Sequence, residues 1–335
     1  MQILVTGATG FIGSRISQAL LAAGHHVRAL HRSTSSLRAL ADLPIEPYPG
    51  DILSPSSLEE AIAGVEAVIH CAGELGQRAS RLSAEAVIAS HVLGTRNVVE
   101  AALRTGVARL VYTSSVAAFG VPEIPTAGQT TPLMTESHEW NYNARLWPYG
   151  YAKHMAELEV MEAVGKGLEA VIVNPSIVIG AGDFNLASNA FILQAALHGI
   201  PVAAPGGVNV VYIGDVIQGH LAALERGTPG ERYILAGENL SIPRLLSLTA
   251  GLVGRRPPRL TIPLAILRAG TPALELVPRL LGLPIAGSLL RLAGRFFFYD
   301  SSKAHIELGL GPPKAYHLAA AEALNWFAEN GYLPK

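Results

Sequence analysis

A tyrosine and a lysine stand four residues apart near the middle of the chain, as Tyr149 and Lys153 in the segment YGYAK. On a helix, side chains at this spacing share one face, so the phenol and the ammonium would lie close together. A phenol is a poor base at neutral pH, but a neighbouring ammonium stabilises the phenolate and lowers its pKa. The pair therefore predicts proton transfer, with Tyr149 as acid or base. Tyr151 is only two residues from Lys153 and would point elsewhere, so it is the weaker candidate.

Two serines supply the third element of such a site. Residues 110–113 have the apolar pattern of a buried strand, and Ser114 and Ser115 follow directly. A hydroxyl at the end of a strand can donate to a carbonyl oxygen and polarise it. Tyr149, Lys153 and one of these serines therefore form the candidate catalytic set.

A glycine-rich turn opens the chain directly after an apolar run at residues 2–6, with the spacing G-x-x-G-x-x-G. Glycine is needed where the chain turns tightly, where the backbone approaches a pyrophosphate, and where a helix packs closely on a sheet. The N-terminus of the following helix offers unpaired N–H groups and a positive dipole end to phosphates. We therefore predict a dinucleotide-binding turn. Its expected contacts are Gly7, Thr9, Gly10, Phe11, Ile12 and Gly13.

The end of the second predicted strand bears on the choice of cofactor. An NAD site usually has an acidic residue about 20 residues beyond the glycines, where it binds the ribose. Here the sequence is Leu30-His31-Arg32-Ser33, without a carboxylate. The Arg32 guanidinium can bind a 2′-phosphate through two hydrogen bonds, with Ser33 or Thr34 assisting and His31 beside them. We expect NADP rather than NAD, and NAD stays open if Arg32 only stacks on adenine.

Composition excludes several other classes of function. Of 335 residues, 50% are apolar and 15% are charged, which is typical of a globular chain with one large core and a smaller appended unit. A net charge of −1 leaves no basic footprint for nucleic acid. The single cysteine, Cys71, excludes an internal disulfide and favours a reducing compartment, so we expect a cytoplasmic protein. The histidines lack metal-ligand spacing, and prolines and charges interrupt the apolar segment 260–298, so we expect neither a metal site nor a membrane span.

The first half of the chain alternates short apolar runs with longer helical patterns, which predicts parallel strands joined by crossover helices. The predicted strands are 2–6, 26–30, 45–48, 67–71, 110–113 and 170–174. The predicted helices are about 12–23, 56–63, 84–105 and 149–165. We therefore expect an α/β fold, a six-stranded doubly wound parallel sheet of the Rossmann type. Such a sheet binds its ligand at the carboxyl ends of the strands.

The pattern loosens in the second half of the chain. The irregular segment 120–148 is long enough to be functional, and its Trp140, Tyr142 and Trp147 either line a substrate pocket or pack the loop down. A strand is expected at 210–213. Further expectations are a helix at 216–226 with Asp215 as its N-cap, and a final amphipathic helix at 316–329.

These patterns divide the chain into two units. We expect a nucleotide-binding domain from residues 1–174 plus about 208–228. A smaller, partly helical substrate domain would comprise about 175–207 and 229–315, followed by a C-terminal helix in 316–335.

Taken together, the motifs resemble the extended short-chain dehydrogenase/reductases, the NAD(P)-dependent epimerase/dehydratase superfamily. Within it the chain is most similar to dihydroflavonol-4-reductase-like proteins, including the hopanoid-associated branch often labelled as sugar epimerases. The motifs that carry the resemblance are residues 6–13, Gly50-Asp51, His70-Cys71-Ala72-Gly73, Gly94-Thr95-Arg96-Asn97, 112–115, Tyr149 with Lys153, Asn174-Pro175-Ser176, 211–216 and 230–235.

The resemblance implies hydride transfer at nicotinamide C4, with Tyr149 as acid or base. Ser115, rather than Ser114, would bind the substrate oxygen, and Lys153 would hold the nicotinamide ribose. Further cofactor contacts implied by the resemblance are Asp51, Ile52, Cys71, Ala72, Gly73, Pro175, Ser176 and Ile177.

Two positions in these motifs need separate comment. Asp51 follows a predicted strand, so its carboxylate can accept from the adenine amino group or form a turn, and both roles stay open. His91 stands where the family pattern N-x-x-G-T has asparagine, which puts the usual hydrogen bonding there in doubt.

Two missing arginines bear on the substrate. Sugar-nucleotide epimerases resemble one another in carrying arginines where this chain has Asn174 and, near the later strand, Asn209. A buried diphosphate without basic partners is costly, so we expect a reductase or dehydrogenase acting on a moderately apolar alcohol or carbonyl. The alternatives are a nucleoside-diphosphate-sugar epimerase or dehydratase using bound NAD, and a non-catalytic NAD(P)-sensing protein. The helices at 84–105 and 149–165 are those that pair into a four-helix homodimer interface in many members of the family, whereas reductase-like members can be monomeric, so both states stay open.

Overall fold

The central sheet holds seven strands in the order β10-β6-β5-β4-β1-β2-β3, and every neighbouring pair is parallel. This computed structural model describes residues 1–73, 83–124, 131–186, 188–265 and 292–333. The strands are β1 (Gln2–Thr6), β2 (His26–His31), β3 (Glu46–Pro49), β4 (Ala67–His70), β5 (Arg109–Thr113), β6 (Ala170–Pro175) and β10 (Arg232–Leu235). The sheet is thus confirmed as a doubly wound parallel sheet.

The expectation of six strands was wrong by one. β10 pairs with β6 and completes the edge, but it lies in the second half of the chain, where the regular alternation of strands and helices loosens. The residues of β4 and β6 are buried throughout, because helices cover both faces of the sheet.

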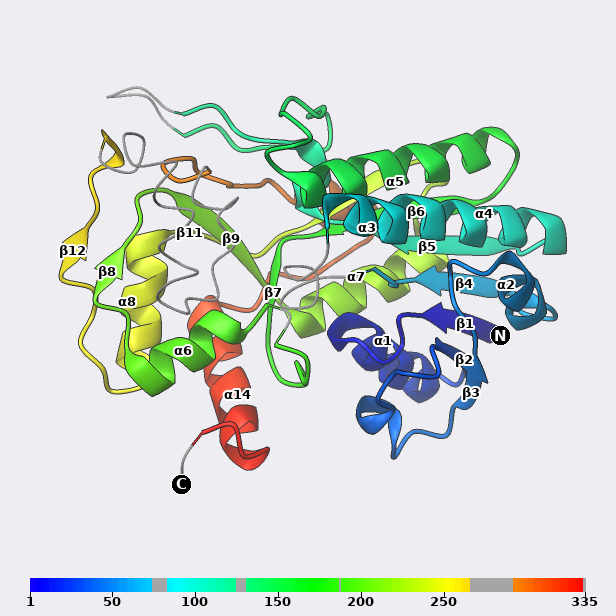
Figure 1. Ribbon diagram of the computed structural model, residues 1–335, viewed down its shortest axis with the longest axis horizontal. Helices are drawn as coiled ribbons and strands as arrows, with labels where there is room; N and C mark the ends of the chain where they lie inside the picture. Colours follow the sequence, from blue (N-terminus) through cyan, green and yellow to red (C-terminus); the bar gives the residue numbers. More distant parts are fainter. Residues whose placement is uncertain (74–82, 125–130, 187, 266–291, 334–335) are drawn as a thin grey trace.

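Helices form a layer on each face of the sheet (Figure 1). On one face, α1 packs against α7, and on the other, α4 lies between α2 and α5. Their bounds are α1 (Phe11–Ala22), α2 (Pro55–Ile62), α3 (Ala84–Ile88), α4 (Gly94–Thr105), α5 (Pro148–Gly165) and α7 (Ile213–Arg226). The predicted helix at 84–105 is interrupted by a π turn at Ala89–Leu93, which joins α3 to α4.

A second unit lies beyond one end of the central strands (Figure 1). Its three-stranded sheet has the order β11-β9-β7, with β7 and β9 parallel and β11 antiparallel to β9. A separate apolar core joins this sheet to three helices. The elements are β7 (Ile177–Ile179), α6 (Ala190–His198), β8 (Val202–Ala203), β9 (Gly207–Tyr212), β11 (Glu238–Ser241), α8 (Ile242–Leu252), β12 (Leu260–Thr261) and α14 (Tyr316–Glu329).

The role expected for Asp215 was wrong. Helix α7 already begins at Ile213, and Asp215 lies within its first turn rather than before it. Its Oδ2 accepts from the backbone N–H of Lys314 at 2.8 Å, so it ties α7 to the segment that precedes α14. A further short helix, α13 (Ser302–Glu307), packs against β10.

The apolar segment 260–298 falls largely outside the described residues, which omit 266–291. Within the parts of the chain that are described, no helix is long and apolar enough to cross a membrane.

Candidate active site

Helix α5 carries a polar line along its sheet-facing side. Tyr149, Lys153 and Glu157 follow one another at intervals of four residues, and the last two are 5% and 3% exposed. The helix begins at Pro148, whose fixed φ suits a first helical position. A Cβ on Gly150 would lie within 3.0 Å of the Trp140 and Trp147 rings and the Ala117 carbonyl. The small residue thus lets the start of α5 sit close against its neighbours.

The Lys153 ammonium is held at the end of β5. Its Nζ donates to the carbonyl oxygen of Thr113 at 2.8 Å and to the hydroxyl of Tyr112 at 3.4 Å. Burial lowers the pKa of Lys153 to about 8, against the opposing influence of Cys71 and Glu157. The ammonium is therefore fixed in place, and its pKa lies only slightly above neutral pH.

The pKa of Tyr149 is shifted in the direction opposite to the one that the sequence predicted. Burial raises the pKa of its phenol to about 12, and a hydrogen bond with the Ser115 side chain only partly offsets this. The predicted lowering of this pKa was wrong for this arrangement, because the Lys153 ammonium is turned to the Thr113 carbonyl. Tyr149 is thus a protonated phenol at neutral pH, which suits a proton donor.

The two serines after β5 have different partners. Ser114 Oγ donates to Glu157 Oε1 at 2.5 Å inside the protein. Ser115 Oγ accepts from the N–H of Ala117 at 3.2 Å and reaches Tyr149. Ser115, the serine favoured by the family pattern, therefore shares a site with the phenol, and Ser114 does not.

The glycine turn after β1 fits a dinucleotide. Gly7 has φ +69°, and a Cβ there would lie 2.7 Å from the backbone nitrogen of Ala72, beyond β4. A Cβ on Gly13 would lie 2.3 Å from the Gly7 carbonyl oxygen. Gly10 is the N-cap residue of α1 and offers no side-chain cap. The N–H groups of the first helical turn, from Phe11 on, have no partners within the helix. These donors and this close-packed backbone suit a pyrophosphate.

The ends of β2 and β3 bring the expected adenosine contacts together. The N–H of Gly50 donates to the carbonyl of His31 at 2.9 Å, which sets Asp51 beside the exposed Arg32. Asp51 Oδ1 accepts from the N–H of Leu53 at 2.9 Å, so Asp51 does form a turn.

The neighbouring residue Ile52 is held from α4. Asn97 Nδ2 donates to its carbonyl at 2.9 Å, and a Cβ on Gly94 would lie 2.5 Å from its Cδ1. The family motif Gly94–Asn97 thus shapes the loop that carries Asp51 and Ile52.

The loop after β6 leads from the central sheet to the second unit. Pro175 ends β6 and Ile177 begins β7. Between them, Ser176 Oγ donates to Asn209 Oδ1 at 2.6 Å. The same Asn209 donates to the carbonyl of Gly237 and to the side chain of Asn239, so it is committed to internal bonds.

Histidine and threonine side chains form a buried layer beneath this edge of the sheet. His70 lies between Thr6 Oγ1 at 2.7 Å and Thr95 Oγ1 at 3.1 Å, and burial lowers its pKa to about 3. Cys71 Sγ lies 3.0 Å from Thr113 Oγ1, and burial raises the pKa of its thiol to about 11. A thiol with this pKa is unreactive at neutral pH, which favours a packing role for Cys71.

Three site residues were missed by the candidate set. His91 lies in the π turn with its ring against Tyr149, and π turns often occur at functional sites. Glu157 could have been found, because it lies two turns beyond Tyr149 on the same face. Asn174 was considered only because it stands where sugar-nucleotide epimerases carry an arginine. In the structure its side chain donates hydrogen bonds to Glu157 and to the Ser115 carbonyl.

The aromatic residues of the irregular segment pack beside Tyr149. Trp147 is 8% exposed, and its ring meets Phe297 edge-on with centroids 5.9 Å apart. Trp140 lies 6.0 Å from Trp147 and stacks on His154 of α5. These contacts pack the loop down, as one alternative held. They also make the surroundings of Tyr149 apolar.

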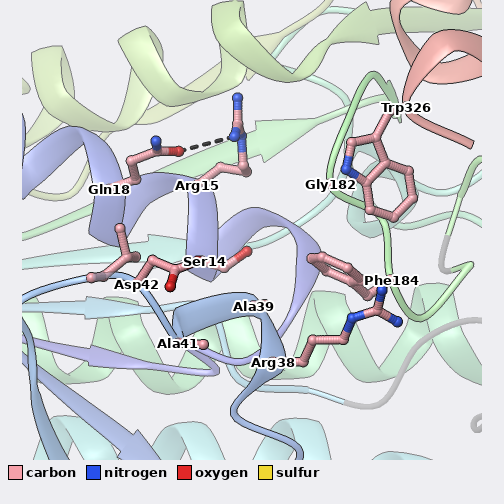
Figure 2. A pocket seen from close by; sticks show the side chains of 11 residues that line it. Ser14, Arg15, Gln18, Arg38, Ala39, Ala41, Asp42, Gly182, Phe184 and Trp326 are labelled. Atoms are coloured by element: carbon pink, nitrogen blue, oxygen red, sulfur yellow. Dashed lines mark hydrogen bonds between the residues drawn. The ribbon is translucent and has the colours of Figure 1, made fainter. Parts of the chain in front are cut away.

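A separate pocket of about 250 Å³ lies beside α1 (Figure 2). Arg15 and Gln18 of α1 are joined by a 2.9 Å hydrogen bond, and Phe184 and Trp326 lie across from them. None of its lining residues belongs to the predicted site, so this pocket does not include Tyr149, Lys153 or Ser115.

Comparison with known proteins agrees with this arrangement. A model of the NAD dependent epimerase/dehydratase family matches residues 3–236. The chain is 36% identical over 340 residues to a putative dihydroflavonol 4-reductase of Synechocystis sp., covering 98% of this chain and 95% of the relative. It is 32% identical over 349 residues to sterol demethylase protein B of Methylococcus capsulatus, covering 99% and 100%.

A solved structure extends the likeness to the whole fold. The crystal structure of a nucleoside-diphosphate-sugar epimerase from Pseudomonas aeruginosa superposes with a TM-score of 0.79 at 29% identity, covering 100% of this chain and 99% of that one. The chain therefore belongs to the NAD dependent epimerase/dehydratase family and is an NAD(P)-dependent oxidoreductase of the extended short-chain dehydrogenase/reductase type.

Proposed function

We propose that this enzyme reduces a ketone of a moderately apolar small molecule, with NADPH as the favoured cofactor. The observation that carries the proposal is the placement of the Tyr149 phenol, which is hydrogen-bonded to Ser115 and lies among apolar rings, where burial raises its pKa to about 12. A phenol whose pKa lies well above neutral donates a proton rather than accepting one, so it suits the direction of reduction.

The residues divide the reaction between them. The Gly7–Gly13 turn would hold the pyrophosphate of the dinucleotide and Pro175–Ile177 its nicotinamide, and the bound cofactor would supply a hydride to the carbonyl carbon. Ser115 Oγ holds the carbonyl oxygen, and Tyr149 gives that oxygen its proton, which yields the alcohol and leaves a phenolate. Solvent then returns the proton to Tyr149, while the Lys153 ammonium, fixed by the Thr113 carbonyl, would hold the nicotinamide ribose.

The preference for NADPH rests on Arg32. Its exposed guanidinium directly follows β2, and the sequence at that strand end, Leu30-His31-Arg32-Ser33, has no carboxylate of its own. A guanidinium suits a phosphate because it can form two parallel hydrogen bonds. Asp51, bonded to the backbone of Leu53, completes the adenosine end.

A second candidate is a nucleoside-diphosphate-sugar epimerase, the activity named for the similar Pseudomonas structure. Asn174 and Asn209 weigh against it, because both are buried and bonded within the protein. Neither carries the positive charge that a buried diphosphate needs.

Two further proposals concern the assembly. The second unit, residues 175–207 and 229–315, binds the substrate over the crevice.

The chain forms a homodimer through α4 and α5, where Leu158 and Met161 are 47% and 41% exposed. Sedimentation velocity measures this oligomeric state directly.

The function is tested with NADPH or NADH against aromatic and alicyclic ketones, and with UDP-glucose or dTDP-glucose. We expect ketone-dependent oxidation of NADPH, slower with NADH. Conversion of a sugar nucleotide without net oxidation of the cofactor contradicts the proposal and supports the epimerase.

A further inference from the structure

We propose that Glu157 is a positioning residue of this site: its buried carboxylate holds Asn174, and through Asn174 it holds the backbone of Ser115. Glu157 lies two turns beyond Tyr149 on α5. It does not touch the reacting atoms. The inference rests on the proposed roles of Tyr149, Lys153 and Ser115.

The Glu157 carboxylate binds side chains from three neighbouring parts of the central sheet. Its Oε1 accepts from Ser114 Oγ at 2.5 Å, after β5, and from Asn174 Nδ2 at 2.6 Å, in β6. Its Oε2 pairs with Arg232 Nη1 of β10 at 3.4 Å. A carboxylate that is 3% exposed is retained only with such partners, and here each comes from a different strand of one sheet edge.

Asn174 carries the effect to Ser115. Its Nδ2 donates both to Glu157 Oε1 and, at 3.1 Å, to the carbonyl oxygen of Ser115. A flipped amide would set its oxygen against two acceptors, so these contacts fix its orientation. Asn174 Oδ1 then has no hydrogen-bond partner among the described residues. Asn174 is fully buried, so this arrangement does not serve stability alone.

Glu157 also acts on Lys153 by charge. The groups facing the Lys153 ammonium are His70 at the end of β4, Cys71 directly after it, Tyr112 from β5, and Glu157 one turn along α5. The Glu157 charge raises the pKa of Lys153, opposing burial. Glu157 faces Arg232 in turn. Burial raises the pKa of Glu157, and the hydrogen bonds from Ser114, Asn174 and Arg232 and the charge of Arg232 offset this only in part.

The first test measures ketone reduction by Glu157→Ala, Asn174→Ala and the double variant. Each single change should lower kcat about 10- to 100-fold, because Ser115 is displaced from the substrate oxygen. The double variant should lose no more than the worse single one, since both act through one contact. Glu322→Ala is the matched control: this half-buried carboxylate of α14 binds a tyrosine and a lysine away from the site. Multiplicative losses, or an equal loss in the control, overturn the proposal.

Glu157→Gln keeps an acceptor oxygen and removes the charge, so it is the variant expected to fold. We expect the alkaline limb of its pH profile to move to lower pH, because Lys153 loses a supporting charge. A residue that only packs leaves this limb in place, and an unmoved limb counts against Glu157.

A readout without turnover separates this inference from the proposed function. In TROSY spectra of labelled protein, Glu157→Ala should shift the amide of Val116, whose peptide bond carries the Ser115 carbonyl, and Glu322→Ala should not. An unshifted Val116 amide overturns the inference. Inactive wild-type enzyme contradicts the proposed function only, since the spectra still decide the role of Glu157.

Discussion

The imidazole of His91 lies edge-on to the phenol ring of Tyr149, with ring centroids 5.6 Å apart and planes inclined by 76°. His91 is 2% exposed and lies at the centre of the π turn between α3 and α4. On its other side, Gly73 comes so close that a Cβ there would stand 2.3 Å from His91 Cε1. His91 thus contacts both the loop after β4 and the Tyr149 phenol, and we expect it to position the Tyr149 ring.

Gly73→Ala is therefore expected to act on Tyr149 through His91. The new methyl group overlaps the imidazole, which must move toward the phenol or away from its site. We expect kcat for ketone reduction to fall about 10-fold or more, as small displacements in a site commonly cause. Gly165→Ala, at the end of α5 with nothing within 4 Å, is the control and should leave kcat unchanged. Equal activity of the two variants would show that His91 does not position the phenol.

The pH profile should be set on its alkaline side by Lys153 and not by Tyr149. The pKa of Lys153 is lowered to about 8, whereas that of Tyr149 is raised to about 12. Above pH 8 the ammonium loses its proton while the phenol keeps its own, so kcat/KM for reduction should decline from about pH 8. In Lys153→Arg the charge persists to high pH, and the residual activity should lose this decline. A decline that persists in Lys153→Arg contradicts the assignment.

Arg32→Ala should weaken NADPH much more than NADH. Loss of charge-assisted hydrogen bonds to a phosphate costs about 1.5–3 kcal/mol, or roughly 10- to 100-fold in Kd. The Kd of NADH should stay within about threefold, because NADH lacks the 2′-phosphate. Arg104→Ala, an exposed arginine of α4 paired with Glu59 and Glu100, is the control. Fluorescence titration of both cofactors measures the ratio, and an equal loss for NADH and NADPH argues against a phosphate contact.

Gly7→Ala should be more harmful than Gly24→Ala, although both glycines have positive φ, +69° and +82°. A Cβ on Gly24 meets nothing within 4 Å, so its cost is the backbone strain of about 1–2 kcal/mol. At Gly7 the Cβ also collides with the backbone of Ala72. Urea unfolding should therefore show a larger loss of stability for Gly7→Ala, and calorimetry a loss of cofactor binding in that variant alone. Identical stabilities would mean that the turn does not pack as described.

The sequence predicts most of the central sheet because its signals are local. The glycine turn, the apolar strands and the Tyr149 helix can each be recognised from a few consecutive residues. Their observed ends lie within two residues of the expected positions. β10 follows β9 and α7, outside the regular alternation of the first half of the chain, and it joins the central sheet by pairing with β6. The start of α7 at Ile213 was missed because Asp215 is a good capping residue in isolation.

The site shows the same division between local and assembled features. The positions of Tyr149, Lys153 and Ser115 follow from helical spacing and a strand end. The state of the phenol does not, because burial raises the pKa of Tyr149 and the Thr113 carbonyl engages the ammonium. The contact of Asn174 with Ser115 joins residues 59 positions apart, so no local pattern carries it.

The most direct test of the account compares Tyr149→Phe with Tyr151→Phe in ketone-dependent oxidation of NADPH. Tyr151 lies on the same helix, but its ring rests against Trp140, 5.9 Å away, so removal of its hydroxyl should leave kcat nearly unchanged. Removal of the Tyr149 hydroxyl takes away the proposed proton donor, and kcat should fall by about 100-fold or more while NADPH still binds. A Tyr149→Phe enzyme that reduces the ketone at the wild-type rate would contradict the central claim.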